Sequence, residues 1–162
     1  MTETEKAVNR AMQLLTARDY TEKQLRDKLA KTFEEQETAE AVAYVKSYHY
    51  LDDVRYADNY LEYYKDFRSY RRMEMDLLRK GIARDIIRGC WEEKLAAGCD
   101  YDEGAQIRNL LEKRHFDASC ADYKEKQRTY AFLCRKGFSG EAIRKYMCRF
   151  VKHMLHRCQI IF

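Results

Sequence analysis

This sequence of 162 residues contains no proline, and no apolar run approaches the ~20 residues that a membrane-spanning helix needs. Its apolar residues come in short amphipathic groups, and 36% of all residues are charged. The first ten residues carry four charged side chains and no apolar segment of the kind found in signal peptides. We therefore expect a cytoplasmic protein with no membrane partner.

Patterns that carry chemistry are also scarce. The six cysteines form no C-x-x-C pair and no tight framework, so we interpret them as reduced thiols. The six glycines are scattered, which excludes a glycine-rich phosphate loop, and no serine lies in a nucleophile elbow. His153, His156 and Cys158 form a weak metal-like group, for which Cys148 would have to supply the fourth ligand. We predict no enzyme activity, no metal and no cofactor.

What the sequence does contain is one amphipathic helix pattern after another, with apolar residues recurring every three or four positions. The predicted fold class is therefore all-α, with about nine helices. Four expected helices are 4–17, 83 to about 96, 102–114 and 124–136. Another opens at the Thr21 cap and ends near residue 31, one follows the Thr38 cap, two lie in the stretch 50–81, and the last runs from the Ser139 cap to about residue 154.

Several helix starts and stops are readable from side-chain type. Thr21 and Gln24 form a capping-box pattern, in which each side chain accepts from the other residue's backbone N–H. Hydroxyls at Ser69 and Ser139 also suit helix starts. Phe33 to Glu37 is predicted to be an acidic loop, after which Thr38 would cap a helix that turns Ala41, Val42, Val45 and Tyr48 inward.

Three similar tripeptides each follow a basic amphipathic helix, which indicates an internal repeat. They are Lys31-Thr32-Phe33, Lys80-Gly81-Ile82 and Lys136-Gly137-Phe138. Gly81 and Gly137 are expected in the left-handed conformation that closes a helix, whereas Thr32 resists it, so the first of these helices should end differently. We predict three tandem three-helix modules, 1–50, 51–98 and 99–162, that form an elongated, curved body.

Positive charge is concentrated late in the chain. Residues 1–50 hold 8 basic and 9 acidic side chains, residues 51–97 hold 10 of each, and residues 98–162 hold 13 and 8. The last third therefore carries a net charge of +5, which suggests a polyanionic partner. A solvated helical surface of mixed charge is the simpler explanation when charge alone is considered.

Two motifs in the middle of the chain resemble the RecX family, whose members are bacterial regulators of the RecA recombinase. The motifs are Leu51-Asp52-Asp53-Val54-Arg55-Tyr56-Ala57 and Arg79-Lys80-Gly81-Ile82. Family members commonly carry Gly-Pro at the start of the basic helix in the middle repeat, where this chain has Ser69-Tyr70. The serine still supplies a helix cap, but a proline-fixed turn is absent.

The resemblance implies a protein that lies along the RecA–DNA filament and modulates, by inhibition, its recombinase and ATPase activities in DNA repair and the SOS response. Single- or double-stranded DNA would then be a partner that binds weakly on its own. We expect the protein to be a monomer. A helical DNA-binding module that acts without recombinase is the alternative, and an α-helical adaptor with no nucleic-acid role is a third reading.

Basic residues on the second helix of each module are the candidates for partner or nucleic-acid binding, because they could contact phosphates or acidic side chains. Taken singly, each is more simply an ordinary exposed charge, whereas the repeated set favours binding. The candidates are Lys23, Arg26, Lys28, Lys31, Arg71, Arg72, Arg79, Lys80, Lys124, Lys126, Arg128, Arg135 and Lys136, continued by Arg144 and Lys145.

The adjacent Asp52 and Asp53 are interpreted as a helix cap and an ion-pair partner of Arg55, because neighbouring helical residues point about 100° apart and do not converge on one substrate. Tyrosines crowd the following helix. Tyr60 and Tyr64 are predicted to pack in the module core, which leaves Tyr63 and Tyr70 as the better candidates for stacking on bases.

Overall fold

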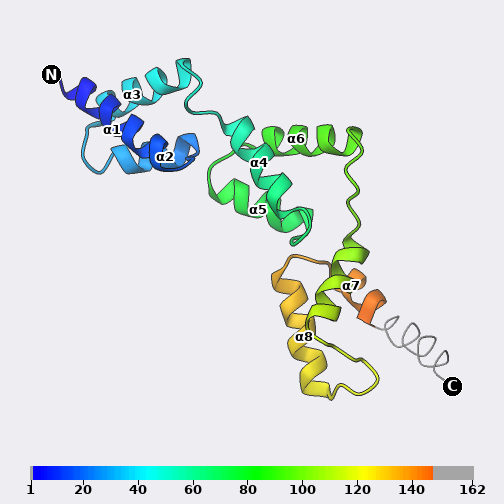
Figure 1. The fold of residues 1–162 in the computed structure, drawn as a ribbon. Helices are drawn as coiled ribbons and strands as arrows, with labels where there is room; N and C mark the ends of the chain where they lie inside the picture. Colours follow the sequence, from blue (N-terminus) through cyan, green and yellow to red (C-terminus); the bar gives the residue numbers. More distant parts are fainter. Residues whose placement is uncertain (1, 148–162) are drawn as a thin grey trace. The chain divides into compact units, whose positions relative to one another are not determined.

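The computed structural model describes residues 2–147, and that part of the chain is all-α, as predicted (Figure 1). A further helical segment covers residues 140–147, so that the predicted end of the last helix lies outside the described residues. The helices are α1 (Glu3–Ala17), α2 (Glu22–Leu29), α3 (Glu35–Ser47), α4 (Asp53–Tyr64), α5 (Tyr70–Arg79), α6 (Arg84–Ala96), α7 (Glu103–Lys113) and α8 (Tyr123–Arg135).

The first three helices pack together around a small apolar core (Figure 1). Ala7 and Ala11 of α1 are fully buried, which brings the α1 backbone close to α3, and Leu25 and Leu29 of α2 complete the core. A capping box at Thr2, not predicted from the sequence, fixes the start of α1. The apolar spacing within each helix therefore determines which face is buried.

Two predictions about α3 are wrong. The helix begins at Glu35, inside the predicted acidic loop, because carboxylates suit the positive end of the helix dipole. Thr38 consequently lies within the helix, where it is buried, and does not cap it. Tyr48 is 58% exposed because the helix ends at Ser47, and the inward-facing periodicity stops there.

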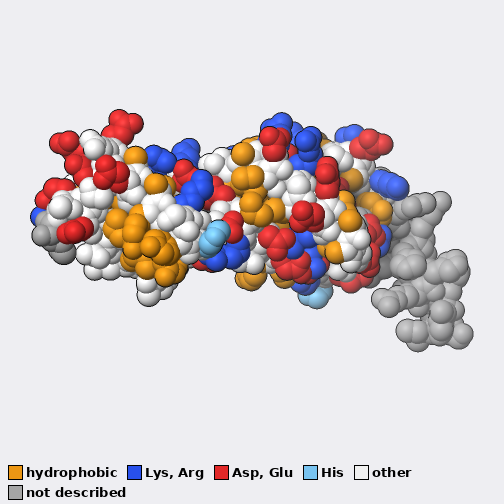
Figure 2. Space-filling view, turned by 90° about the horizontal axis from the view of Figure 1, so that it is seen from above, with side chains coloured by type: hydrophobic (Ala, Val, Ile, Leu, Met, Phe, Trp, Pro, Cys, Tyr) orange, Lys and Arg blue, Asp and Glu red, His pale blue; other side chains and the backbone are white. Residues whose placement is uncertain are grey.

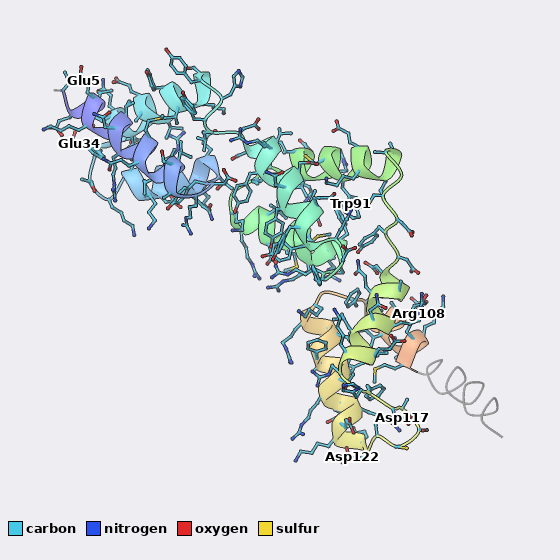
Figure 3. The ribbon with its side chains drawn as sticks, viewed as in Figure 1. Glu5, Glu34, Trp91, Arg108, Asp117 and Asp122 are labelled. Carbon is cyan, nitrogen blue, oxygen red and sulfur yellow. The ribbon has the colours of Figure 1, made fainter. Side chains whose placement is uncertain are left out.

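Polar contacts connect α4, α5 and α6. The Lys94 ammonium on α6 lies 2.8 Å from Asp58 and 3.1 Å from Glu62, both on α4. The Tyr60 hydroxyl donates to Asp76 of α5 at 3.2 Å. Trp91 of α6, labelled in Figure 3, is buried. These three helices are thus held by side chains at their rims as well as by buried apolar faces.

A separate apolar core lies between α7, α8 and the segment that follows them. Ile107, Leu111, Leu133 and Ile143 are fully buried in it. Asp122 caps α8 (Figure 3), and Asp102 caps α7. Ser139 caps the last segment as predicted, because its hydroxyl accepts from the Ala142 N–H at 3.1 Å.

By packing, the chain divides into two compact units. The first unit comprises residues 1–63 and 74–99, and the second comprises residues 64–73 and 100–162. These units do not decide the predicted repeat boundaries, which remain a sequence-based prediction. Within residues 2–147, every helix is too short or too polar to cross a membrane.

Candidate partner-binding interface

The predicted capping box at the start of α2 is present, and its threonine also bonds to the next predicted repeat. Thr21 Oγ1 accepts from the Gln24 N–H at 3.2 Å, and the Gln24 side chain accepts from the Thr21 N–H at 3.3 Å. The same hydroxyl donates to the carbonyl of Lys80, just after α5, at 2.6 Å. The Glu22 N–H donates to Asp53 Oδ1, at the start of α4, at 2.9 Å.

The start of α5 makes the corresponding contact with the end of α8. Ser69 caps α5 by accepting from the Arg72 N–H at 3.2 Å, as predicted. The N–H and the hydroxyl of Ser69 both donate to the carbonyl of Lys136, each at 3.3 Å. We call the Thr21–Lys80 contact the first joint and the Ser69–Lys136 contact the second joint. In both joints, a capping hydroxyl residue of one repeat bonds to a helix-terminal carbonyl of the next.

In each joint the lysine precedes a left-handed glycine, as the sequence predicted. The φ angle is +91° at Gly81 and +92° at Gly137. A Cβ atom on Gly81 would overlap the Lys23 side chain, and one on Gly137 would overlap Ser69 and Arg72. Both positions therefore need glycine for its conformation and also for the close approach of a neighbouring repeat.

The joints bring together candidate cations that the sequence places in different repeats. Lys23 of α2 packs against Gly81, directly after Lys80. Arg72 of α5 packs against Gly137, directly after Lys136. The candidate residues thus gather at the joints, an arrangement that the repeat pattern alone did not reveal.

Acidic neighbours offset much of the positive charge near the first joint. Glu22 lies 2.9 Å from Arg26 and 2.7 Å from Lys46, and Arg79 lies 3.8 Å from Asp76. The hydrogen bond from Lys46 lowers the pKa of Glu22, and the same bond raises the pKa of Lys46.

Two further groups beside the first joint are partly withdrawn from solvent. Burial raises the pKa of Asp53, because desolvation penalises its charged form. The part-buried Lys80 ammonium lies 5.5 Å from the centre of the Tyr56 ring and 5.8 Å from that of Tyr60. An approaching anion would therefore meet a site in which several charges are already compensated.

The outward face of α8 is different, because three cations share it. Lys124, Arg128 and Arg135 fall on one face by helical spacing, opposite the buried Leu133, and all three are exposed. Only Ala131 lies between them on that face. We call these three cations the α8 cationic face. It presents separated positive charges along the helix, as contacts to successive phosphates require.

The candidates as a whole set differ in exposure. Those that are exposed could meet a partner without rearrangement, whereas a part-buried cation has already lost part of its hydration. Arg72, Lys80 and Lys136 are partly buried, and Lys136 lies over the Phe132 ring. The exposed candidates are Lys23, Arg26, Lys28, Lys31, Arg71, Arg79, Lys124, Lys126, Arg128, Arg135, Arg144 and Lys145.

Net charge differs in sign between the two units. The described residues of the first unit hold 14 basic and 18 acidic side chains, a net charge of −4. Those of the second unit, 64–73 and 100–147, hold 14 basic and 9 acidic side chains, a net charge of +5. Basic and acidic side chains are interspersed on the face drawn in Figure 2. The positive net charge of the described residues therefore lies in the second unit.

The adjacent aspartates act separately, as predicted for capping residues. Asp52 Oδ1 accepts from the N–H groups of Val54 and Arg55 at the start of α4, whereas Asp53 binds the α2 backbone. The predicted ion pair with Arg55 is wrong, since the Arg55 guanidinium donates to the carbonyl of Tyr50 at 3.5 Å.

The tyrosine predictions have mixed outcomes. Tyr60 and Tyr64 are only partly buried, so they border the core of their module rather than fill it. Tyr63 is 68% exposed, as a stacking residue would have to be. Tyr70 is partly buried, and its N–H donates to the Tyr101 hydroxyl at 2.6 Å.

No group of three potential metal ligands lies together within residues 2–147. The histidine and cysteine group suggested by the sequence at its carboxyl end, Cys148 to Cys158, lies outside the described residues.

Sequence reasoning missed an exposed aromatic cluster at the end of α3. Tyr44, Tyr48 and Tyr50 are 46%, 58% and 50% exposed. The i, i+4 spacing of the first two could have shown that they share a helix face. The helical spacing of Tyr48 with Ala41 and Val45 instead suggested an inward orientation.

Two family models match the chain. The third three-helix domain of RecX matches residues 101–147, and the first three-helix domain of RecX matches residues 7–45. These matches cover the cores around α7–α8 and α1–α3.

Curated relatives extend the similarity along most of the chain. Regulatory protein RecX of Trichlorobacter lovleyi is 35% identical, covering 83% of this chain and 89% of the relative. The protein of the same name in Cronobacter sakazakii is 31% identical, covering 84% and 87%. The crystal structure of RecX from Lactobacillus salivarius shares the fold, with a TM-score of 0.68, 23% identity, and coverage of 93% of this chain and 97% of that one.

Proposed function

This chain belongs to the RecX family of regulatory proteins, and on that premise we propose that it binds the RecA–DNA filament and inhibits its recombinase and ATPase activities in DNA repair and the SOS response. The observation that carries the nucleic-acid part of this proposal is the +5 charge of the second unit, with the α8 cationic face on its surface.

The physical mechanism is attachment through several linked contacts. Exposed lysine and arginine side chains can contact phosphates of the filament's DNA or acidic side chains of the recombinase. Each such contact is weak by itself, because exposed ion pairs contribute little. Joined on one chain, they gain from effective concentration, so a protein with repeated contact sites binds an extended filament far better than one site would.

Co-sedimentation of the purified protein with assembled recombinase filaments tests this function, with ATP hydrolysis measured in the same samples. We expect the protein to pellet with the filament and the ATPase rate to fall as it does so. A protein that stays in the supernatant and leaves the ATPase rate unchanged contradicts the proposal.

The second candidate function is DNA binding without recombinase, and the concentration of positive charge in the second unit favours it. Titration of bare duplex and single-stranded DNA at several salt concentrations discriminates the two. Tight, strongly salt-dependent binding to bare DNA would support the second function. Weak binding to bare DNA with strong binding to the filament would support the first.

A further inference from the structure

The aromatic cluster at the end of α3, which consists of Tyr44, Tyr48 and Tyr50, is an ordered surface feature. The Tyr44 and Tyr48 ring centres are 4.9 Å apart and tilted, and those of Tyr48 and Tyr50 are 6.2 Å apart and stacked. The neighbouring Tyr48 raises the pKa of Tyr44, chiefly because two ionised phenol groups would repel each other. Three rings that support one another in this way present a broad aromatic face to solvent.

Acidic residues lie on the same helix as this cluster. The N-cap of α3 and its first two turns carry Glu34, Glu35, Glu37 and Glu40. The single cation of α3, Lys46, is bound to Glu22 at 2.7 Å. Figure 2 shows an apolar patch, in orange, with acidic side chains on one side of it and a histidine and basic side chains on the other. Acidic side chains therefore outnumber cations by four to one over α3 and its N-cap.

We propose that the tyrosine cluster is a docking surface for an arginine- or lysine-bearing segment of a protein partner. A cation over a tyrosine ring is attracted by the negative face of the π-system, and guanidinium groups also stack on such rings. The acidic residues of α3 would attract the same segment. The tyrosine hydroxyls can in addition bond to its backbone carbonyls.

The protein already uses this type of contact elsewhere. The Arg18 guanidinium lies 4.4 Å from the centre of the Tyr20 ring, and that of Arg68 lies 4.0 Å from the Tyr64 ring. Among the described residues, by contrast, no lysine or arginine lies over the rings of the tyrosine cluster. The cluster thus keeps its cation-accepting faces open to a partner.

Charge distinguishes this partner from nucleic acid. Bases could stack on exposed tyrosines, but the attached phosphates would approach an acidic helix in a unit with a net charge of −4. The cation at the edge of the cluster, Arg55, donates to the carbonyl of Tyr50. The net electrostatics therefore favour a cationic protein segment over a polyanion.

Fluorescence anisotropy with a labelled eight-residue peptide of alternating arginine and glycine tests this inference. We expect the full chain to bind it, and the triple variant Y44A/Y48A/Y50A to bind at least about tenfold more weakly, because three cation–ring contacts are lost. The triple phenylalanine variant should stay within about twofold, since it keeps the rings. Tyr123→Ala, at a 76% exposed tyrosine of the second unit, should leave the affinity unchanged.

Equal peptide affinity for the wild type and the triple alanine variant overturns the inference, and so does a wild type that does not bind. A single-stranded oligonucleotide is the second probe. If the alanine variant loses as much affinity for it as for the peptide, the cluster is a base-stacking surface and the proposal is wrong.

The cationic segment is defined here by its chemistry, and its assignment to the recombinase rests on the proposed function. Filament co-sedimentation separates the two. A wild type that fails to pellet counts against the proposed function, whereas the peptide measurement still decides the role of the tyrosines.

Discussion

At the scale of single residues, glycine has different roles at positions with almost the same backbone angle. Gly81, Gly98 and Gly137 all have positive φ, at +91°, +87° and +92°. A side chain on Gly98 would meet nothing within 4 Å, whereas one on Gly81 or Gly137 would collide with a neighbouring repeat. Conformation alone therefore explains Gly98, and contact between repeats adds a second requirement at the joints.

Gly137→Ala should lower the free energy of unfolding by about 2–4 kcal/mol, from left-handed strain of about 1–2 kcal/mol plus the displacement of Ser69 and Arg72. Gly98→Ala is the matched control and should lose only the strain, about 1–2 kcal/mol. Denaturant unfolding monitored by circular dichroism measures both. Equal losses would mean that the second joint tolerates a methyl group.

Glu22→Gln tests the charge balance near the first joint. The folded-state pKa of Glu22 lies below its ordinary value of 4.5, so its stabilising effect is present above that pH and is lost as pH falls through the folded pKa. The free energy of unfolding of the wild type should exceed that of the variant by about 0.5–1 kcal/mol at pH 7. This difference should shrink toward zero below pH ~4. Unfolding measured across this range checks the trend, and a difference that grows in acid would refute it.

At the scale of elements, one side chain can both begin a helix and fasten it to another. Thr21 caps α2 and donates to Lys80, whereas Thr2 caps α1 with a comparable capping box and no such second contact. Substitution of Thr21 and of Thr2 therefore separates the energetic effect of the joint from that of a helix cap.

Thr21→Ala should destabilise the protein by about 2–3 kcal/mol, because it removes a cap and leaves the Lys80 carbonyl without its donor. Thr2→Ala should cost about 1 kcal/mol or less, since it removes the cap alone. Thr21→Ser keeps the hydroxyl and should stay close to wild type. Thermal and denaturant unfolding of the three variants provide the measurement, and equal effects of the two alanine variants would exclude an energetic role for the joint.

The sequence predicted the features whose causes are local. The capping box at Thr21, the cap at Ser69 and the left-handed Gly81 each depend on a few adjacent residues, and all are confirmed. The start of α3 was mispredicted because Thr38 is a good capping residue but the acidic residues before it also favour a helix.

The joints could not be predicted in the same way. Their partners lie far apart in the chain, with Thr21 bonded to Lys80 and Ser69 to Lys136. Nothing in the local pattern shows that a capping hydroxyl will donate outside its own helix. The exposure of Tyr48 was missed for a related reason, because it depends on where α3 ends.

At the scale of the whole molecule, the two units differ more in acidic than in basic side chains. Each has 14 basic side chains in its described residues, but the first has 18 acidic side chains and the second has 9. The positive net charge of the second unit therefore goes with its smaller number of acidic side chains, since the number of cations is the same in both units.

The variant K124Q/R128Q/R135Q should weaken binding to bare single-stranded DNA and reduce the slope of log affinity against log salt by about 2, since three phosphate contacts are lost. The control R10Q/R84Q/R88Q removes the same charge from exposed residues of the first unit that are not binding candidates, and should change the slope little. Anisotropy titrations at several salt concentrations provide the measurement. Equal slopes for the two variants would show that the α8 cationic face has no special role.

The two joints also show which residues a contact of this kind between successive repeats requires. Such a joint needs a hydroxyl residue at the N-cap of the second helix of one repeat. It also needs a glycine directly after the second helix of the next repeat. The middle repeat has both, in Ser69 and Gly81, whereas the first has Thr32 in place of the glycine and the third has the carboxylate of Asp122 in place of the hydroxyl. Lengthening the series by the same link would therefore require Thr32→Gly on one side or Asp122→Ser on the other.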